Sequence, residues 1–237
     1  MARLKPFSSI APALCSTALL FGGGAHAQNA SDSWPDLTGN YRPAVDEGLS
    51  PIEDFELGDF AGLPLNELGL ATAQAWDPGV QFLPENQCNP HSVPYIMRSF
   101  LPFQIRYEDG NVVIYHQSFE QVRTIYMDGR EPPANAEPTW MGHSVGRWEG
   151  ETLVVETSHF KAGYIRTNGA PHSDQARLLE RYYRYGDILT YLVILEDPMY
   201  LSEPFIDFRG ARHFPGLELA PYPCDVRPRP RVRPRPQ

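Results

Sequence analysis

The segment from Trp140 to His159 constrains the fold more than any other part of the chain. It holds two stretches of strand-forming residues on either side of Glu149-Gly150, and a two-residue turn there predicts an antiparallel hairpin. In that register His143 lies opposite Glu156, and directly opposed residues have Cβ atoms about 4.5 to 5.5 Å apart. An imidazole beside a carboxylate can hold or move a proton near neutral pH. We therefore interpret His143 and Glu156 as a candidate catalytic acid/base dyad.

The same pair also has a structural interpretation, as a cross-strand ion pair on the outer face of a sheet. The two faces of the hairpin do not separate into an apolar and a polar one. The face of His143 and Glu156 also carries Met141, Val145, Arg147, Val154 and Ser158, and the opposite face carries Ser144, Gly146, Leu153 and Val155. The two interpretations differ in whether the pair faces a cavity.

Residues 1–27 are typical of an export signal. Arg3 and Lys5 precede an apolar stretch over residues 10–21, and Ala25-His26-Ala27 forms a small-residue cleavage site. No later run approaches the roughly 20 apolar residues that a membrane-spanning helix needs. The sequence thus predicts a periplasmic or secreted protein without a transmembrane segment.

Removal of residues 1–27 would leave an acidic chain with two cysteines. Loss of the two positive charges in residues 1–27 moves the formal net charge from −9 to −11, which disfavours nucleic acid as a partner. Cys88 and Cys224 remain, and an oxidising compartment favours a disulfide between them over two unpaired thiols.

The remaining chain divides into three parts. Residues 28–102 are rich in proline and predict an extended N-terminal arm packed on a barrel, with one short helix near residues 65–76. Residues 103–215 form the main β-domain, to which a first strand near residues 37–42 can belong. Residues 216–237 form an Arg/Pro-rich tail that favours an exposed polyproline II conformation.

Hairpin signals are regular after residue 103. Asp109-Gly110 and Gly186-Asp187 each separate two runs of strand-forming residues. Further predicted strands cover residues 121–127 and 205–213. About eight strands joined in sequence protect their edges best by closing on themselves. We therefore predict an all-β fold, an antiparallel up-and-down barrel of about eight strands with room for side chains or one small ligand.

Several segments resemble a group of exported bacterial proteins of uncharacterised function. The segments are Pro35–Gly39, Val122–Arg130, Pro138–Thr157, Pro171–Ser173 and Glu196–Pro198, and the Trp140 to Thr157 motif is the most specific. The resemblance covers about residues 35 to 205. It implies export and names no reaction. The expected architecture is similar to lipocalin-like (calycin) and nitrobindin-type barrels, and such a likeness does not fix a function.

Six more residues are candidates for substrate binding. Arg123 and Tyr126 fall on opposite faces of one strand, so one of them can point inward, where an arginine needs an anionic partner or ligand. Trp140 and Trp148 share a face and can line a cavity, although core packing also explains them. His172 lies in a loop that can reach a barrel mouth, or is a plain loop histidine. Arg181 opposes Leu192, and if it points inward it can bind a substrate oxygen.

The histidines lack His-x-His and His-x-x-x-His spacing, and the chain has no Gly-x-Ser-x-Gly elbow, phosphate-binding loop or dinucleotide fingerprint. We therefore expect no metal and no cofactor, with haem bound through one histidine as an alternative by architectural analogy. The predicted function is binding of a small, largely apolar organic molecule, with a cofactor-free acid/base reaction of the isomerase, cyclase or lyase type. The alternatives are a non-catalytic periplasmic carrier and an envelope interaction protein.

Overall fold

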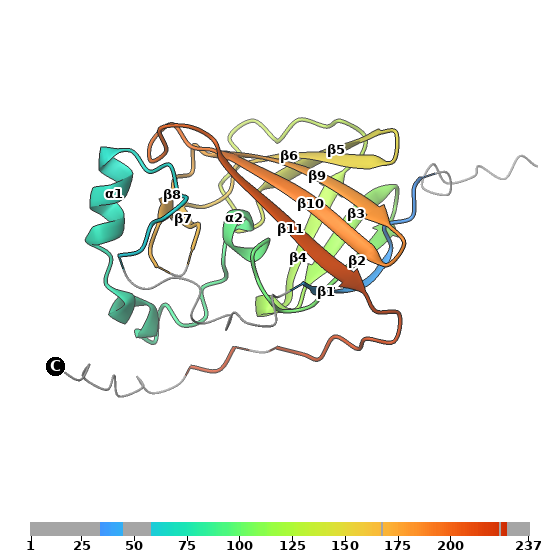
Figure 1. The fold of residues 1–237 in the computed structure, drawn as a ribbon, viewed down its shortest axis with the longest axis horizontal. Helices are drawn as coiled ribbons and strands as arrows, with labels where there is room; N and C mark the ends of the chain where they lie inside the picture. Colours follow the sequence, from blue (N-terminus) through green and yellow to red (C-terminus); the bar gives the residue numbers. More distant parts are fainter. Residues whose placement is uncertain (1–33, 45–57, 167, 223, 227–237) are drawn as a thin grey trace, which may run out of the picture.

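Nine strands close into a barrel. The structure, a computed structural model, describes residues 34–44, 58–166, 168–222 and 224–226. Around the barrel the order is β1, β2, β3, β4, β5, β6, β9, β10 and β11, and β11 pairs again with β1 (Figure 1). The bounds are β1 Gly39–Pro43, β2 Phe103–Glu108, β3 Asn111–His116, β4 Gln121–Tyr126, β5 His143–Glu149, β6 Thr152–Ser158, β9 Arg177–Tyr185, β10 Ile188–Glu196 and β11 Phe205–His213. The predicted all-β barrel is confirmed.

The structure differs in detail from the predicted antiparallel up-and-down barrel of about eight strands. The described barrel has nine strands, and β4 pairs with β5 in parallel, Ile125 with Ser144 and Tyr126 with Val145. Strands that alternate in direction close a ring only when their number is even, so a ring of nine requires a parallel pair. The long loop over residues 127–142 makes that pair possible, because parallel neighbours need a connection of about a dozen residues or more.

Two of the three predicted hairpin registers are confirmed. Glu108 faces Asn111 across Asp109-Gly110, and Arg181 faces Leu192 in the β9–β10 hairpin. The register of the central hairpin is wrong, because its turn is formed by the residues after Glu149, which pairs with Thr152. Gly150 takes the first turn position with a φ of +62°, as Gly186 does with +57° in the β9–β10 hairpin. Glycine adopts this left-handed conformation at little cost, which fixes the turn one residue later than predicted.

Short helices and a small two-stranded sheet lie beside one end of the barrel (Figure 1). Their bounds are α1 Glu67–Gln74, η2 Pro78–Phe82, α2 Val93–Ile96, η3 Ser118–Glu120, β7 Gly163–Tyr164 and β8 Pro171–His172. The Asn66 side chain caps α1 by accepting a hydrogen bond from the Gly69 N–H at 2.8 Å. A bridge between Leu65 and Leu201 ties this segment to the chain after β10. The helix expected near residues 65–76 is therefore present as α1.

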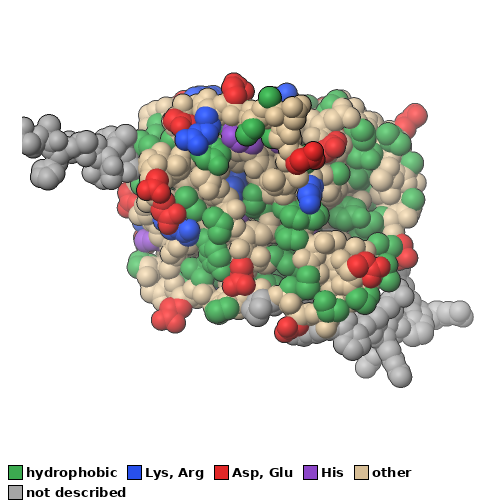
Figure 2. All heavy atoms as spheres, turned by 180° about the vertical axis from the view of Figure 1, so that it is seen from behind, with side chains coloured by type: hydrophobic (Ala, Val, Ile, Leu, Met, Phe, Trp, Pro, Cys, Tyr) green, Lys and Arg blue, Asp and Glu red, His purple; other side chains and the backbone are tan. Residues whose placement is uncertain are grey.

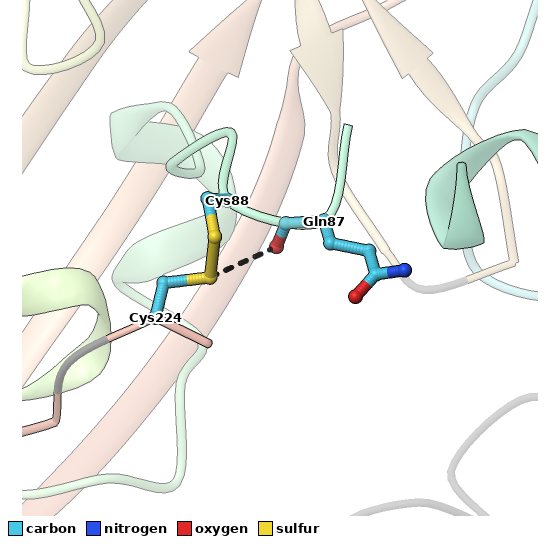
Figure 3. The surroundings of a disulfide bond; sticks show 3 residues. All are labelled: Gln87, Cys88 and Cys224. Atoms are coloured by element: carbon cyan, nitrogen blue, oxygen red, sulfur yellow. Dashed lines mark hydrogen bonds between the residues drawn. A yellow bond between two sulfur atoms is a disulfide. The ribbon is translucent and has the colours of Figure 1, made fainter. Parts of the chain in front are cut away.

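The chain after β11 runs back along the barrel towards α1 (Figure 1). The Gln117 amide donates a hydrogen bond to the Ala220 carbonyl at 2.9 Å, and the rings of Phe119 and Tyr222 meet edge to face. The predicted disulfide between Cys88 and Cys224 is confirmed, and the Cys224 Sγ lies 3.5 Å from the Gln87 carbonyl oxygen (Figure 3). Residues 1–27, predicted to be an export signal, and tail residues 227–237 lie outside the described residues.

The face opposite to that of Figure 1 carries acidic and basic side chains interspersed with apolar ones (Figure 2). Within the described ranges, no helix has the length and apolar character needed to cross a membrane.

Candidate functional site

The structure separates His143 from Glu156 in register. His143 faces Ser158, and Glu156 faces Val145. Both side chains belong to the outer face of the barrel, because the alternate residues Ser144 and Thr157 are the buried ones. The hydrogen-bonded dyad that the sequence predicted is therefore not formed, and the one-residue shift of the turn is the reason.

Each of the two residues has another partner on that outer face. The Glu156 side chain is 65% exposed and accepts a hydrogen bond from Arg147 at 2.6 Å. The His143 ring stacks on Tyr126 and its Nε2 donates to the Arg130 carbonyl at 3.1 Å. Both line an open groove of about 420 Å³ among exposed charged groups. The alternative interpretation placed both residues on the outer face, where they are found, but the ion pair between His143 and Glu156 that it supposed is not formed either.

Arg123 points into the barrel, as one of the two candidates on β4 was expected to. It is 1% exposed and forms a bidentate ion pair with Glu180, which is fully buried. Its Nε donates to Ser144 at 3.0 Å and its Nη2 to Thr157 at 2.7 Å. Tyr182 donates to the same Glu180 carboxylate at 2.7 Å. The anionic partner that a buried arginine needs is therefore a residue of the protein.

The pKa values in this network follow from burial and charge. Burial alone would lower the pKa of the Arg123 guanidinium, but the Glu180 carboxylate raises it above its ordinary value. Burial, together with the charge of Arg123, lowers the pKa of His116 to about 3. The interior of the barrel thus holds a charged pair with internal partners.

Three other candidates do not share a site with Arg123. Tyr126 lies on the outer face, where Arg130 stacks over its ring. Trp148 packs against Trp34 with ring centroids 6.2 Å apart. Arg181 is 40% exposed and donates to Glu149 at 2.6 Å. Arg181 therefore points away from the interior.

A cavity of about 880 Å³ lies outside the barrel, beside the small sheet of β7 and β8. Residues of α1, η2, α2, β7, β8 and the end of the chain line it, and none of them belongs to a barrel strand. Its aromatic lining residues are Tyr95, Phe119, Trp140, Tyr164, Tyr200 and Tyr222. His172 also lines it. Two of the predicted binding residues, Trp140 and His172, are therefore brought to one cavity.

His172 forms a hydrogen bond with a serine at this cavity. Its Nε2 lies 2.5 Å from the Ser92 Oγ, and its Nδ1 lies 3.2 Å from the Ser173 carbonyl oxygen. Ser173 in turn donates to Asp197 from its backbone N–H at 2.6 Å and from its hydroxyl at 2.7 Å. His172, Ser92 and Asp197 are each at most 3% exposed. These contacts fix the orientation of the ring.

The contacts also determine which ring nitrogen carries the proton. A carbonyl oxygen only accepts, so in the neutral ring Nδ1 donates to Ser173 and Nε2 accepts the hydroxyl proton of Ser92. Burial lowers the pKa of His172 to about 4, against the opposing effects of the Ser173 carbonyl and the Asp197 charge. His172 is therefore a neutral base near physiological pH, with Nε2 as the atom that receives a proton.

Sequence reasoning missed Ser92, Glu180 and Asp197. Ser92 is 80 positions from His172, and no spacing rule joins a serine before a short helix to a histidine in a distant loop. Glu180 lies between Arg177 and Arg181, on the opposite face of the strand from both, and this alternation was an available signal that Glu180 points inward.

Among the described residues, no group of three or more His, Cys, Asp or Glu side chains is arranged to hold a metal ion. No protein-family model matches the chain, and no curated protein matches it. The resemblance at Trp140 to Thr157 remains an expectation from the sequence.

Proposed function

We propose that this exported protein binds a small, largely apolar organic molecule in the 880 Å³ cavity and that His172 transfers a proton there. The main support is the hydrogen bond between His172 and Ser92. It places a buried, neutral histidine base at the wall of an aromatic cavity. Apolar cavities with a few convergent polar groups are the usual form of small-molecule sites. The isomerase, cyclase and lyase reactions expected from the sequence all need such a base.

Ligand binding is testable at Gly163. A Cβ at this position would lie 3.0 Å from the Ser92 Oγ and 3.1 Å from the His172 Nε2, so a larger side chain fills the cavity beside the pair. We expect Gly163→Val to weaken binding of phenylnaphthylamine, a neutral aromatic fluorophore, at least about tenfold, which is about 1.4 kcal/mol. Gly216→Val is the matched control, because nothing lies within 4 Å of a Cβ there. Equal affinities for the two variants would contradict the assignment of the cavity.

Proton transfer is testable with nitrobenzisoxazole, an aromatic probe whose ring opens when a base removes its ring proton. We expect His172→Gln to slow this reaction at least about a hundredfold, since general-base catalysis contributes about 10²- to 10⁴-fold. In the native protein the rate should fall only as the pH approaches about 4, the value to which burial lowers the pKa of His172. Retained phenylnaphthylamine binding with equal rates in both proteins would instead support the non-catalytic carrier.

A further inference from the structure

We propose that Ser92 is a nucleophile and that the protein hydrolyses small carboxylic esters with an apolar acyl or alcohol part. The inference rests on the proposed function for the cavity and for His172 as a base, and it adds a covalent step. The reactions predicted from the sequence do not include this one.

The position of Ser92 explains why its hydroxyl is available. Ser92 is the N-cap of α2, yet its side chain makes no capping hydrogen bond. An N-cap serine normally accepts from the N–H of the second or third helical residue. Here the second residue is Pro94, which has no N–H, and the N–H of the third, Tyr95, donates to the Ser92 carbonyl at 3.0 Å. The hydroxyl is therefore left to donate to His172.

Ser92, His172 and the groups behind them form the chain of hydrogen bonds that is typical of activated serine nucleophiles. A nucleophile donates to a histidine, and a third group holds the ring. In this chain the third group is the Ser173 carbonyl, and the buried Asp197 anchors Ser173 through two hydrogen bonds. Asp197 also accepts from the Met199 N–H at 2.9 Å, so the carboxylate is fixed on both oxygens. When the ring accepts a proton, the negative charge of Asp197 stabilises it.

An ester would lie in the cavity of about 880 Å³ that Ser92, Gly163 and His172 all line. Gly163 packs closely on the pair, since a Cβ there would lie only 3.0 Å from the Ser92 Oγ, so the room for a substrate is on the cavity side of the pair. The aromatic lining suits an apolar acyl or alcohol group. Gln81, Asn86 and Asn89 line the cavity as well, and such side-chain amides can donate to an ester oxygen.

The reaction balances with water as the second substrate. The Ser92 Oγ forms a bond to the carbonyl carbon while its proton moves to the His172 Nε2. The carbon–oxygen bond to the alcohol then breaks, and the alcohol leaves with that proton. Water next gives a proton to Nε2 and its oxygen to the carbonyl carbon. The Ser92 ester breaks, Oγ regains the proton, and the carboxylic acid is released.

A fluorophosphonate probe with an alkyl chain tests the nucleophile directly. The Ser92 Oγ would form a bond to phosphorus, fluoride would leave, and His172 would take the proton. We expect intact mass to show one added phosphonate and peptide mapping to place it on Ser92. Ser92→Ala should abolish the label, and His172→Gln should slow labelling at least about a hundredfold. Ser99→Ala, a serine after the same helix and outside the cavity lining, should label at the native rate.

The melting temperature of each variant shows whether it is folded. Ser92→Cys provides a further test, because this variant keeps a nucleophile at position 92. We expect this variant to react with an alkyl iodoacetamide at the new thiol and His172→Gln to slow that reaction. If folded native protein binds phenylnaphthylamine but takes no phosphonate label at Ser92, the nucleophile is wrong and the proposed function stands. If it neither binds the fluorophore nor accepts the label, both proposals fail. Hydrolysis of phenyl butyrate by the native protein and its loss in Ser92→Ala would complete the support.

Discussion

Replacement of Arg123 by methionine is expected to lower the free energy of unfolding by about 3 to 5 kcal/mol, because it leaves the Glu180 charge buried without its partner. Both side chains of this pair are fully buried. Ser144 and Thr157 would also lose the guanidinium donors that they accept from. Urea unfolding of the native protein and of Arg123→Met, followed by tryptophan fluorescence, measures the difference.

Two control variants make this prediction specific. Arg123→Met combined with Glu180→Leu should recover most of the lost stability, since an apolar pair of similar volume often replaces a buried ion pair at little cost. Arg181→Met, which removes an exposed ion pair with Glu149, should cost at most about 1 kcal/mol. If Arg123→Met and Arg181→Met lowered the free energy of unfolding equally, the buried pair would contribute no more to stability than the exposed one.

Removal of the disulfide by Cys88→Ser with Cys224→Ser is expected to lower the free energy of unfolding by up to about 5 kcal/mol. The bond joins residues 136 positions apart, and opening so long a loop returns much chain entropy to the unfolded state. The effect should extend to the cavity, because Tyr222, Cys224 and Asp225 form part of its wall. We expect phenylnaphthylamine to bind at least about tenfold more weakly, about 1.4 kcal/mol.

Two measurements separate the effect on stability from the effect on binding. Urea unfolding measures the free energy of unfolding, and fluorescence titration below the unfolding transition measures the affinity for phenylnaphthylamine. Unchanged affinity in a folded double variant would mean that the end of the chain does not shape the cavity. An unchanged unfolding midpoint would contradict the role of the disulfide in stability.

Local patterns predicted much of the fold. Asp109-Gly110 fixed the β2–β3 hairpin, because both residues take a positive φ as a type I′ turn requires. The alternation along β4 separated Arg123 from Tyr126 and allowed one to be inside. Compartment chemistry predicted the pairing of Cys88 with Cys224, and the bond is present. The segment 188–196 was predicted as a strand and forms β10.

Long-range contacts were the part that the sequence did not reveal. Moving the central turn by one residue changed the partner of His143 from Glu156 to Ser158, so the predicted dyad depended on one turn position. The partners of Arg123 and His172 are 57 and 80 positions away from them, and only the closed barrel and the packed helices bring them together. The sequence also predicted a ligand site inside the barrel, whereas the cavity of about 880 Å³ lies beside it. Its lining residues come from segments far apart in the chain, which local patterns do not bring together.

We propose that a small apolar molecule occupies the cavity beside β7 and β8, at the Ser92–His172 pair. The most direct measurement is a crystal structure of the protein with bromonaphthalene, in which anomalous scattering locates the bromine. We expect the bromine between Trp140 and His172. A bromine inside the barrel near Arg123, or in the outer groove beside His143, with no ligand at Ser92, would contradict the claim.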